Sequence, residues 1–150
     1  MYKIKFYSSD ETVKLEYTKN VGLDIKSIED IKLKPNGITK VKTGIHICNN
    51  IVKNNWYETN QTFFKVEGRS GLASNGIFPV GGIIDENYRG EICVMLYNIN
   101  EIEYEVKKYD RIAQLVAYQY TNDISIEMTN DKNDIIATDR NDKGFGSSGK

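Results

Sequence analysis

Alternation of hydrophobic and polar residues is the dominant pattern in this 150-residue chain. The alternating segments are residues 2–6, 12–17, 31–34, 40–47 (with the phase kept across Gly44) and, most clearly, 101–107. Because successive side chains of a strand point to opposite faces, this period of two predicts strands with one solvated and one buried face. Residues 91–97 and 112–118 are more uniformly apolar, which predicts strands covered on both faces.

The remaining segments predict connections, with no long amphipathic helix. Residues 49–62 are polar and rich in Asn, which indicates a long connection, and residues 70–74 predict a short helical turn. Many short strands at steady spacing predict an all-β sandwich or barrel. After Ala137 the strand pattern stops, and Gly and Ser crowd the end. We therefore divide the chain into a β domain, residues 1–137, and a flexible C-terminal segment, residues 138–150.

Length and charge narrow the class of protein. The length suits one domain, and 20 basic against 21 acidic residues give a formal net charge of -1. Proteins that bind DNA or RNA usually carry a basic excess, so we expect no nucleic-acid polymer as partner, although a mononucleotide needs only a few cations. The sequence contains neither a long apolar run nor an apolar N-terminal core, which predicts a soluble intracellular protein without a membrane span.

Cysteine and histidine add little chemistry. Cys48 and Cys93 lie in apolar, strand-like stretches without a second cysteine at metal-ligand spacing, so we expect two reduced core thiols. His46 is the only histidine, which excludes a histidine pair and argues against a Ser–His nucleophile. It alternates out of phase with Ile45 and Ile47, as a residue on the outer face of a strand would.

The segment Gly68–Ala73 has the composition of a phosphate-binding turn. Glycines on both sides of Arg69 and Ser70 free the backbone for a tight bend. Exposed N–H groups, a hydroxyl and a guanidinium would then converge, and all three suit phosphate oxygens. An ordinary surface turn is the alternative.

The segment Gly81–Gly90 carries the strongest candidate for acid–base chemistry. An apolar strand enters it and residues 91–96 leave it, which predicts a hairpin. Turn chemistry explains Asn87 and Gly90. Asp85 directly follows Gly-Ile-Ile at the end of a strand, where its carboxylate could act as a general base.

Three further segments stand out. Asp110, Arg111 and Gln114 interrupt an apolar strand, for which an inter-strand salt bridge is the alternative. In residues 140–150 a single Phe145 lies between glycines, an arrangement in which the ring can lie flat on a base. Residues 21–27 form a weaker segment around Asp24 that resembles a surface bend.

Taken in order, these five segments resemble the five motifs of the trimeric dUTPase family, from about Val21 to Lys150. The most specific stretch is residues 82–90 together with residues 110–116. The resemblance implies a jelly-roll-like all-β fold and a homotrimer with active sites at the subunit interfaces. It also implies hydrolysis of dUTP to dUMP and pyrophosphate, which lowers dUTP and supplies dUMP for thymidylate synthesis.

The resemblance also assigns roles to residues. Asp85 would activate the water that attacks the α-phosphorus, and Tyr88 would pack under the deoxyribose. The backbone from Gly82 through Ile83 and Ile84 to Tyr88 would bond the uracil edge. Phosphate contacts would come from Arg69, Ser70 and Gly71, and Gln114 would join the water shell around the phosphates. Mg²⁺ would enter with the triphosphate, with Asp24 reaching it through water.

The C-terminal segment is implied to be a lid. Arg140 would reach the γ-phosphate, Phe145 would cover the uracil, and Gly146, Ser147 and Ser148 would close over the site. By the resemblance, a viral protein would act in the host cytoplasm or nucleus and a cellular one in the cytoplasm.

Several positions depart from the family pattern. Gly68 stands where Pro is common, Tyr109 where Gly is usual, and Phe78-Pro79 where an acidic residue and a further Gly are more usual. Leu23 replaces the usual Tyr of the first motif, and Asn141 and Lys143 occupy usual Gly positions in the last. Two alternatives use the same fold: a dCTP deaminase-like enzyme, whose pattern has Ser-Ser in place of Ser70-Gly71, and a non-catalytic regulatory module.

Overall fold

Almost all regular structure in this protein is strand. The computed structural model describes residues 4–15, 20–48, 60–121, 125 and 127–138. The elements, in chain order, are β1 (Phe6–Ser8), β2 (Leu23–Lys26), β3 (Ile31–Leu33), β4 (Gly37–Val41), β5 (Ile45–Ile47), β6 (Asn60–Glu67), α1 (Ser70–Ala73), β7 (Ile77–Pro79), β8 (Ile83–Asp85), β9 (Val94–Asn98), β10 (Tyr104–Val106), β11 (Arg111–Thr121) and the 3-10 turn η1 (Lys132–Asp134).

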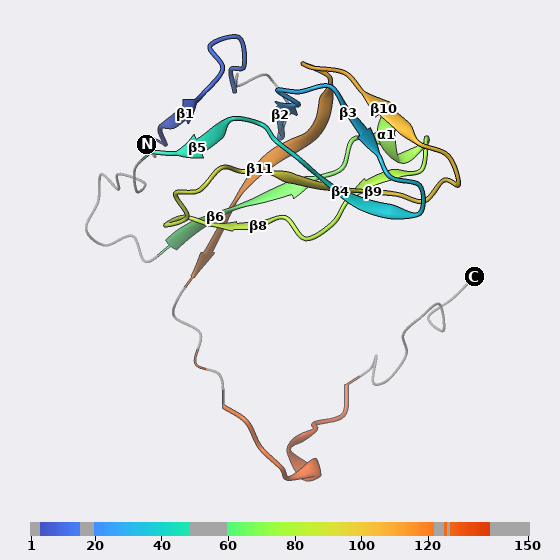
Figure 1. Cartoon of the computed structure of the whole chain (residues 1–150). Coiled ribbons are helices and arrows are strands. Elements are labelled where there is room, and N and C mark those ends of the chain that lie inside the picture. The colour runs from blue at the N-terminus through green and yellow to red at the C-terminus, as the bar shows by residue number, and fades with distance from the viewer. Residues whose placement is uncertain (1–3, 16–19, 49–59, 122–124, 126, 139–150) are drawn as a thin grey trace.

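The strands form two main antiparallel sheets (Figure 1). One has the strand order β2-β11-β6-β8 and the other the order β4-β9-β7, while β1 pairs with β5 and β10 with β3. Buried side chains from both main sheets belong to one hydrophobic cluster, to which β6 contributes Phe64 and β9 contributes Leu96. The predicted all-β sandwich is therefore confirmed.

The four-stranded sheet has one buried and one open face. Along β6, Thr62, Phe64 and Val66 are buried, whereas Phe63 and Lys65 are only partly covered. The alternation predicted for half-covered strands thus appears on this element. Its partly covered face, called the outer face below, bears the candidate site.

Three alternating segments contain less strand than predicted. Of residues 2–6, only Phe6 is in a strand among the described residues. Residues 11 and 12 form a turn and residues 13–15 form no strand, because the Asp10 side chain accepts the Thr12 N–H at 3.0 Å and the Asp10 carbonyl accepts the Val13 N–H at 2.9 Å. Over residues 101–107 only β10 is a strand. The buried Asn98 side chain donates to the Ile102 carbonyl at 2.8 Å and closes a turn before it.

The predicted hairpin around Asp85 is wrong. Strand β8 pairs with β6, whereas β9 pairs with β4 and β7, so the two flanking strands belong to different sheets. The cause is the segment after Gly90. Its Ile92 N–H donates to the Ile45 carbonyl at 2.8 Å and directs the chain toward β5.

Other predictions need smaller corrections. Strand β6 already begins at Asn60, inside the predicted connection 49–62, of which residues 49–59 lie outside the described residues. Cys48 is exposed and Cys93 half-buried, so neither is a core thiol, although both are free. Met95 and Tyr118 are 38% and 39% exposed, so β9 and β11 are not covered on both faces in one chain.

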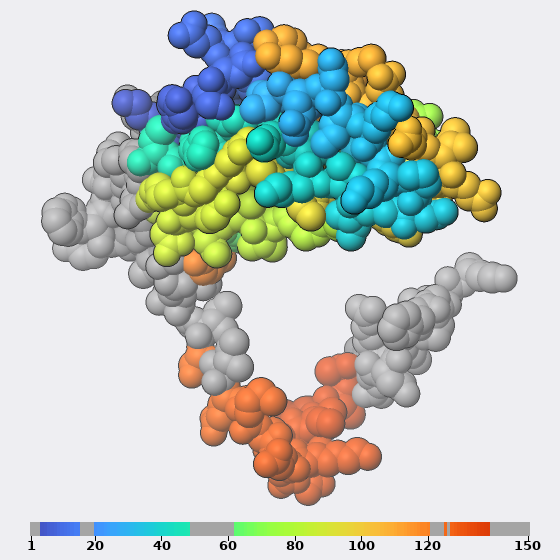
Figure 2. Space-filling view, in the orientation of Figure 1, coloured from blue at the N-terminus to red at the C-terminus, as the bar shows by residue number. Residues whose placement is uncertain are grey.

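The described residues after the last strand, β11, lie apart from the sheets, although all but the last of them were predicted to belong to the β domain. Residues 127–138 are exposed throughout, and Figure 2 shows this orange and red segment standing off the body. Within the described residues no helix has the length and apolar character to cross a membrane.

Candidate active site

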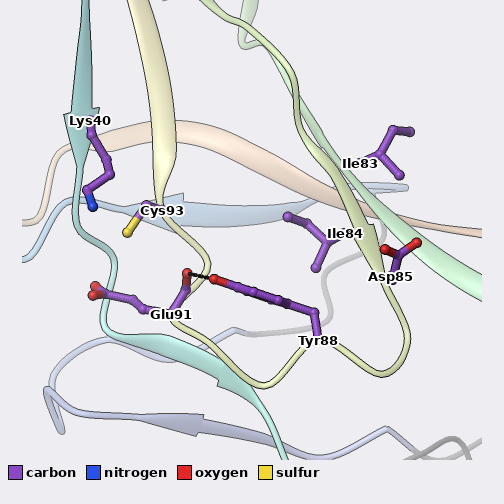
Figure 3. A pocket seen from close by; sticks show the side chains of 7 residues that line it. All are labelled: Lys40, Ile83, Ile84, Asp85, Tyr88, Glu91 and Cys93. Carbon is purple, nitrogen blue, oxygen red and sulfur yellow. Dashed lines mark hydrogen bonds between the residues drawn. The ribbon is translucent and has the colours of Figure 1, made fainter.

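The loop between β8 and β9 encloses a small pocket. Its volume is about 290 Å³, and it is lined by Lys40, Ile83, Ile84, Asp85, Tyr88, Glu91 and Cys93 (Figure 3). The ring of Tyr88 lies across the loop, and its hydroxyl donates to the Glu91 carbonyl at 3.1 Å. The pocket thus offers a flat aromatic surface between the end of β8 and the start of β9.

Two glycines make this loop possible. A Cβ on Gly90 would lie 2.3 Å from the Tyr88 hydroxyl oxygen, so the ring rests in space that only glycine leaves open. Gly82 has a φ of +98° and approaches β6 so closely that a Cβ would lie 2.9 Å from the Val66 carbonyl oxygen. Its own carbonyl accepts the Val66 N–H at 2.8 Å, which fixes the entry to β8.

Glu91 ties the other end of the loop to the body. Its Oε1 accepts the N–H groups of Thr43 at 3.0 Å and of Gly44 at 2.8 Å. The Thr43 hydroxyl in turn donates to the Ile92 carbonyl. The sequence analysis did not single out Glu91, because no local sequence pattern predicts a hydrogen bond between residues 47 positions apart.

Asp85 ends β8 with an exposed side chain. Figure 3 shows Asp85 and Ile83 on one side of the strand and Ile84 on the other, toward Tyr88 and Cys93. Ile84 packs against the core, whereas Ile83 is 59% exposed. The carboxylate is therefore presented on the outer face beside an apolar neighbour.

Cys93 is the thiol in this pocket. Burial, followed by the charge of Glu91, raises the pKa of the Cys93 thiol, which disfavours a nucleophilic thiolate in this pocket.

A second cluster lies at the other end of the same sheet. The Asp24 carboxylate on β2 accepts hydrogen bonds from Nε of Arg69 at 3.0 Å and from Nη1 of Arg111 at 3.4 Å. Nη1 of Arg69 also donates to the Arg111 carbonyl at 3.3 Å. A hollow of about 300 Å³ beside the cluster is lined by Arg69, Gly71 and Arg111 among others. We call Asp24, Arg69 and Arg111 the ion cluster.

Gln114 borders the ion cluster. It lies opposite Asp24 in the β2–β11 pair, and its side-chain amide donates to the Gly68 carbonyl at 2.8 Å. A Cβ on Gly22 would meet the Gln114 oxygen at 2.2 Å, so this glycine leaves room for the amide. Ser70 and Gly71, at the start of α1, are exposed next to Arg69.

The predicted site residues therefore form two groups in one chain. Asp85 lies opposite Phe63 of β6, and Gln114 lies opposite Glu67 of the same strand. At about 3.3 Å per residue, these two rows are roughly 13 Å apart along β6. Asp85 and the ion cluster share the outer face, whereas Tyr88 lies on the side of β8 toward which Ile84 points, and one chain does not bring the two groups together.

Tail residues and metal ligands are the remaining predictions. Arg140, Phe145, Gly146, Ser147 and Ser148 lie outside the described residues. Among the described residues no group of three or more His, Cys, Asp or Glu side chains could hold a metal ion. The Asp24 carboxylate, the predicted ligand through water, is 41% exposed and is paired with Arg69 and Arg111.

Comparisons with known proteins agree on one family. The dUTPase family model matches residues 9–149. The deoxyuridine 5'-triphosphate nucleotidohydrolase of Paramecium bursaria Chlorella virus 1 is 39% identical over 130 residues, which cover 85% of this chain and 82% of the relative. The enzyme of the same name from Fowlpox virus is 33% identical over 153 residues and covers 99% of both chains.

A solved structure shares the fold. The dUTPase of Staphylococcus bacteriophage 80alpha with dUPNHPP superposes with a TM-score of 0.74 at 22% identity and covers 99% of both chains. The jelly-roll-like fold expected from the sequence is thereby confirmed.

Proposed function

The chain belongs to the dUTPase family, and from this premise we propose that it hydrolyses dUTP to dUMP and pyrophosphate. The observation that carries the proposal is the loop after β8, where the exposed Asp85 carboxylate ends a strand beside the Tyr88 ring and its pocket. The reaction would lower dUTP and supply dUMP for thymidylate synthesis. Both are intracellular nucleotides, which fits the location predicted from the sequence.

Asp85 is the general base of this proposal. Its carboxylate takes a proton from a water molecule whose oxygen attacks the α-phosphorus. The bond from that phosphorus to the bridging oxygen breaks, and pyrophosphate leaves with the electron pair. A positioned base of this kind contributes about 10²–10⁴ in rate. Exposure of the carboxylate on the outer face supports access by water and nucleotide.

The Tyr88 loop is the nucleoside site. The ring packs under the deoxyribose and leaves no room for a ribose 2′-hydroxyl, and the backbone from Gly82 to Tyr88 bonds the uracil edge. Cytosine presents an amino donor where uracil presents an acceptor, so fixed backbone groups leave the wrong base unpaired. The hydrogen bond between Gly82 and Val66 supports this preference, because a backbone held in place cannot rearrange its donors and acceptors to suit cytosine.

Arg69 of the ion cluster and the start of α1 are the phosphate site. Arg69 offers paired donors to phosphate oxygens, and Ser70 and Gly71 offer a hydroxyl and backbone N–H groups. Asp24 and Gln114 hold water around the phosphates and would reach Mg²⁺ through it. The ion would supply charge neutralisation on the phosphate oxygens.

A homotrimer would unite the two groups. One chain keeps Asp85 and the ion cluster roughly 13 Å apart along β6 on an open sheet face. That face also bears the exposed side chains of Ile83 and Tyr118, with Phe63 stacked on Tyr118 at 5.2 Å between ring centroids. Exposed aromatic and aliphatic groups of this kind mark contact surfaces. We propose that the Asp85 loop of one protomer faces the ion cluster of another.

The C-terminal segment is proposed to close the site. Arg140 would reach the γ-phosphate, Phe145 would cover the uracil, and Gly146, Ser147 and Ser148 would complete the lid. Deletion of residues 140–150 is expected to collapse turnover. Near-normal activity of the truncated chain would show that the segment is no lid.

A nucleotide panel tests the activity. Pyrophosphate release is measured from dUTP, dCTP, dTTP and UTP, with and without Mg²⁺. We expect Mg²⁺-dependent turnover of dUTP alone. Uracil nucleotide formed from dCTP would favour deamination, and an absence of dUTP turnover would leave only a binding or regulatory role.

A further inference from the structure

Arg111 lies in the ion cluster but carries no role in the reaction proposed above. Its side chain is 57% exposed, and its Nη1 shares the Asp24 carboxylate with Arg69. Surface ion pairs contribute only about 0–1 kcal/mol to stability, so stability alone accounts poorly for this arrangement. Its place in the strand gives a better account.

An irregularity in β11 turns Arg111 toward the outer face. The register of the β2–β11 pair shifts between Arg111 and Ala113, which is the signature of a β-bulge. In a regular strand, residues two apart share a face, and Ala113 is fully buried. The bulge lets Ile112 and Ala113 both point inward, so that Arg111 and Gln114 point outward. Bulges commonly re-aim side chains next to active sites.

The same irregularity gathers positive charge. Arg111 is the register partner of Lys26, and like charges opposite each other are unfavourable in a sheet. Asp24 binds two of the cations at this end of the sheet, Arg69 and Arg111. Two guanidiniums on one carboxylate keep donors available for an anion.

Arg69 is held at two of its three nitrogens. Nε is bound by Asp24 at 3.0 Å, and Nη1 by the Arg111 carbonyl at 3.3 Å. Within the described part of the chain, its Nη2 has no hydrogen-bond partner. A guanidinium is planar, so fixing two nitrogens fixes the direction of the third.

We propose that Arg111 is a positioning residue, which holds the Arg69 guanidinium toward the nucleotide phosphates through Asp24 and through its own carbonyl. The inference rests on the proposed function, because it concerns the same phosphate site. Arg111 here acts on Arg69 and makes no contact of its own with the phosphates.

A double-mutant cycle tests this coupling in the full-length chain. Arg111→Gln alone is expected to lower kcat/KM for dUTP about tenfold and to weaken binding of dUPNHPP by a similar factor, with dUMP affinity unchanged. Arg111→Lys keeps a cation near Asp24 and is expected to restore part of the loss. In an Arg69→Lys background, Arg111→Gln is expected to cost less than twofold further.

Controls separate positioning from stability and from direct binding. Lys32→Gln removes an exposed cation from a distant ion pair with Glu103 and is expected to leave all values unchanged. An equal loss from Arg111→Gln in both Arg69 backgrounds, or a loss of dUMP affinity, would overturn the proposal. The affinity for dUPNHPP can be measured without turnover. If the wild-type protein binds dUPNHPP but does not hydrolyse dUTP, the proposed activity is wrong, and the four binding affinities of the cycle still test whether Arg111 acts through Arg69.

Discussion

The two groups on the outer face are built in opposite ways. The Asp85 loop is shaped by backbone, with glycines at positions 82 and 90 and N–H groups bonded to main-chain oxygens or to Glu91. The ion cluster is shaped by charged side chains from β2, β11 and the turn before α1, joined at 3.0–3.4 Å. Backbone geometry resists change in pH and salt, whereas exposed ion pairs respond to both. The first construction suits shape discrimination of a nucleoside, and the second suits attraction of its phosphates.

Asp85→Asn is expected to give the largest effect. Asparagine keeps the shape of the loop but cannot take a proton from water, so turnover of dUTP should fall by at least about 10²-fold. Affinity for dUPNHPP should change little. Both quantities come from steady-state kinetics and calorimetry, and a variant that keeps a tenth of the wild-type rate would contradict the role.

Gly82→Ala tests the backbone construction. A Cβ on residue 82 would lie 2.9 Å from the Val66 carbonyl oxygen, in a backbone with positive φ. A Cβ on residue 81, where φ is +72°, would have no neighbouring atom within 4 Å. We expect Gly82→Ala to lower the free energy of unfolding by about 1–3 kcal/mol. We also expect the activity per folded molecule to fall, because the loop that binds the nucleoside changes shape. Gly81→Ala is the matched control, because it carries the strain of a positive φ, about 1–2 kcal/mol, without the close contact. Equal behaviour of the two variants in chemical denaturation would refute the close-approach argument.

Asp24→Asn tests the charged construction. Its side chain is 41% exposed, so the variant should lose no more than about 1 kcal/mol of stability, as is usual for exposed pairs. Without the carboxylate, however, two guanidiniums repel each other and Arg69 loses its orientation. We expect a several-fold rise in KM for dUTP at low ionic strength, which becomes smaller as salt screens this repulsion. A variant with wild-type KM at both low and high salt would argue against the cluster as a phosphate site.

The smallest effect is expected outside both groups. Asp10 binds the Thr12 N–H, Lys108 and the Tyr109 hydroxyl, and these bonds, the backbone one foremost, lower its pKa. A carboxyl whose pKa is lowered by folding adds stability above its unfolded pKa, near 3.9, and loses it as the pH falls through the folded value. Asp10→Asn should therefore lower Tm slightly at neutral pH, and this difference should vanish in acid. A difference in Tm that persists in strong acid would exclude this cause.

Sequence reasoning singled out residues of both groups but not how they are connected, for a physical reason. The hairpin predicted around Asp85 is wrong, whereas the inter-strand salt bridge considered for Arg111 is present, to Asp24. Glycines and a strand-terminal aspartate are neighbours in the chain, so Asp85, Tyr88 and Gly90 stand out locally. The ion cluster joins residues 45 and 87 positions apart through a bulge, which no local pattern reveals. Strands failed as predictions where a side chain offered the backbone another partner, as Asp10 and Asn98 do.

The departures from the family pattern are also explained in part by contacts. Tyr109, where glycine is usual, keeps the positive φ of +72° and is held by a 2.7 Å bond from its N–H to the Ser27 carbonyl. Gly68 and Pro79 depart together: a Cβ on Gly68 would lie 3.3 Å from the Pro79 ring. Such paired replacements cannot be recognised before the two segments are seen in contact.

The bulge in β11 also determines which changes of length the strand tolerates. With one residue fewer between positions 111 and 114, the ladder to β2 would become regular, and Arg111 and Gln114, now two apart, would still share the outer face. The strand would lose one of the two neighbouring side chains, Ile112 or Ala113, that both point into the interior. A single deletion here would therefore change packing, as a substitution at either position would, and leave the neighbouring arginine on its face.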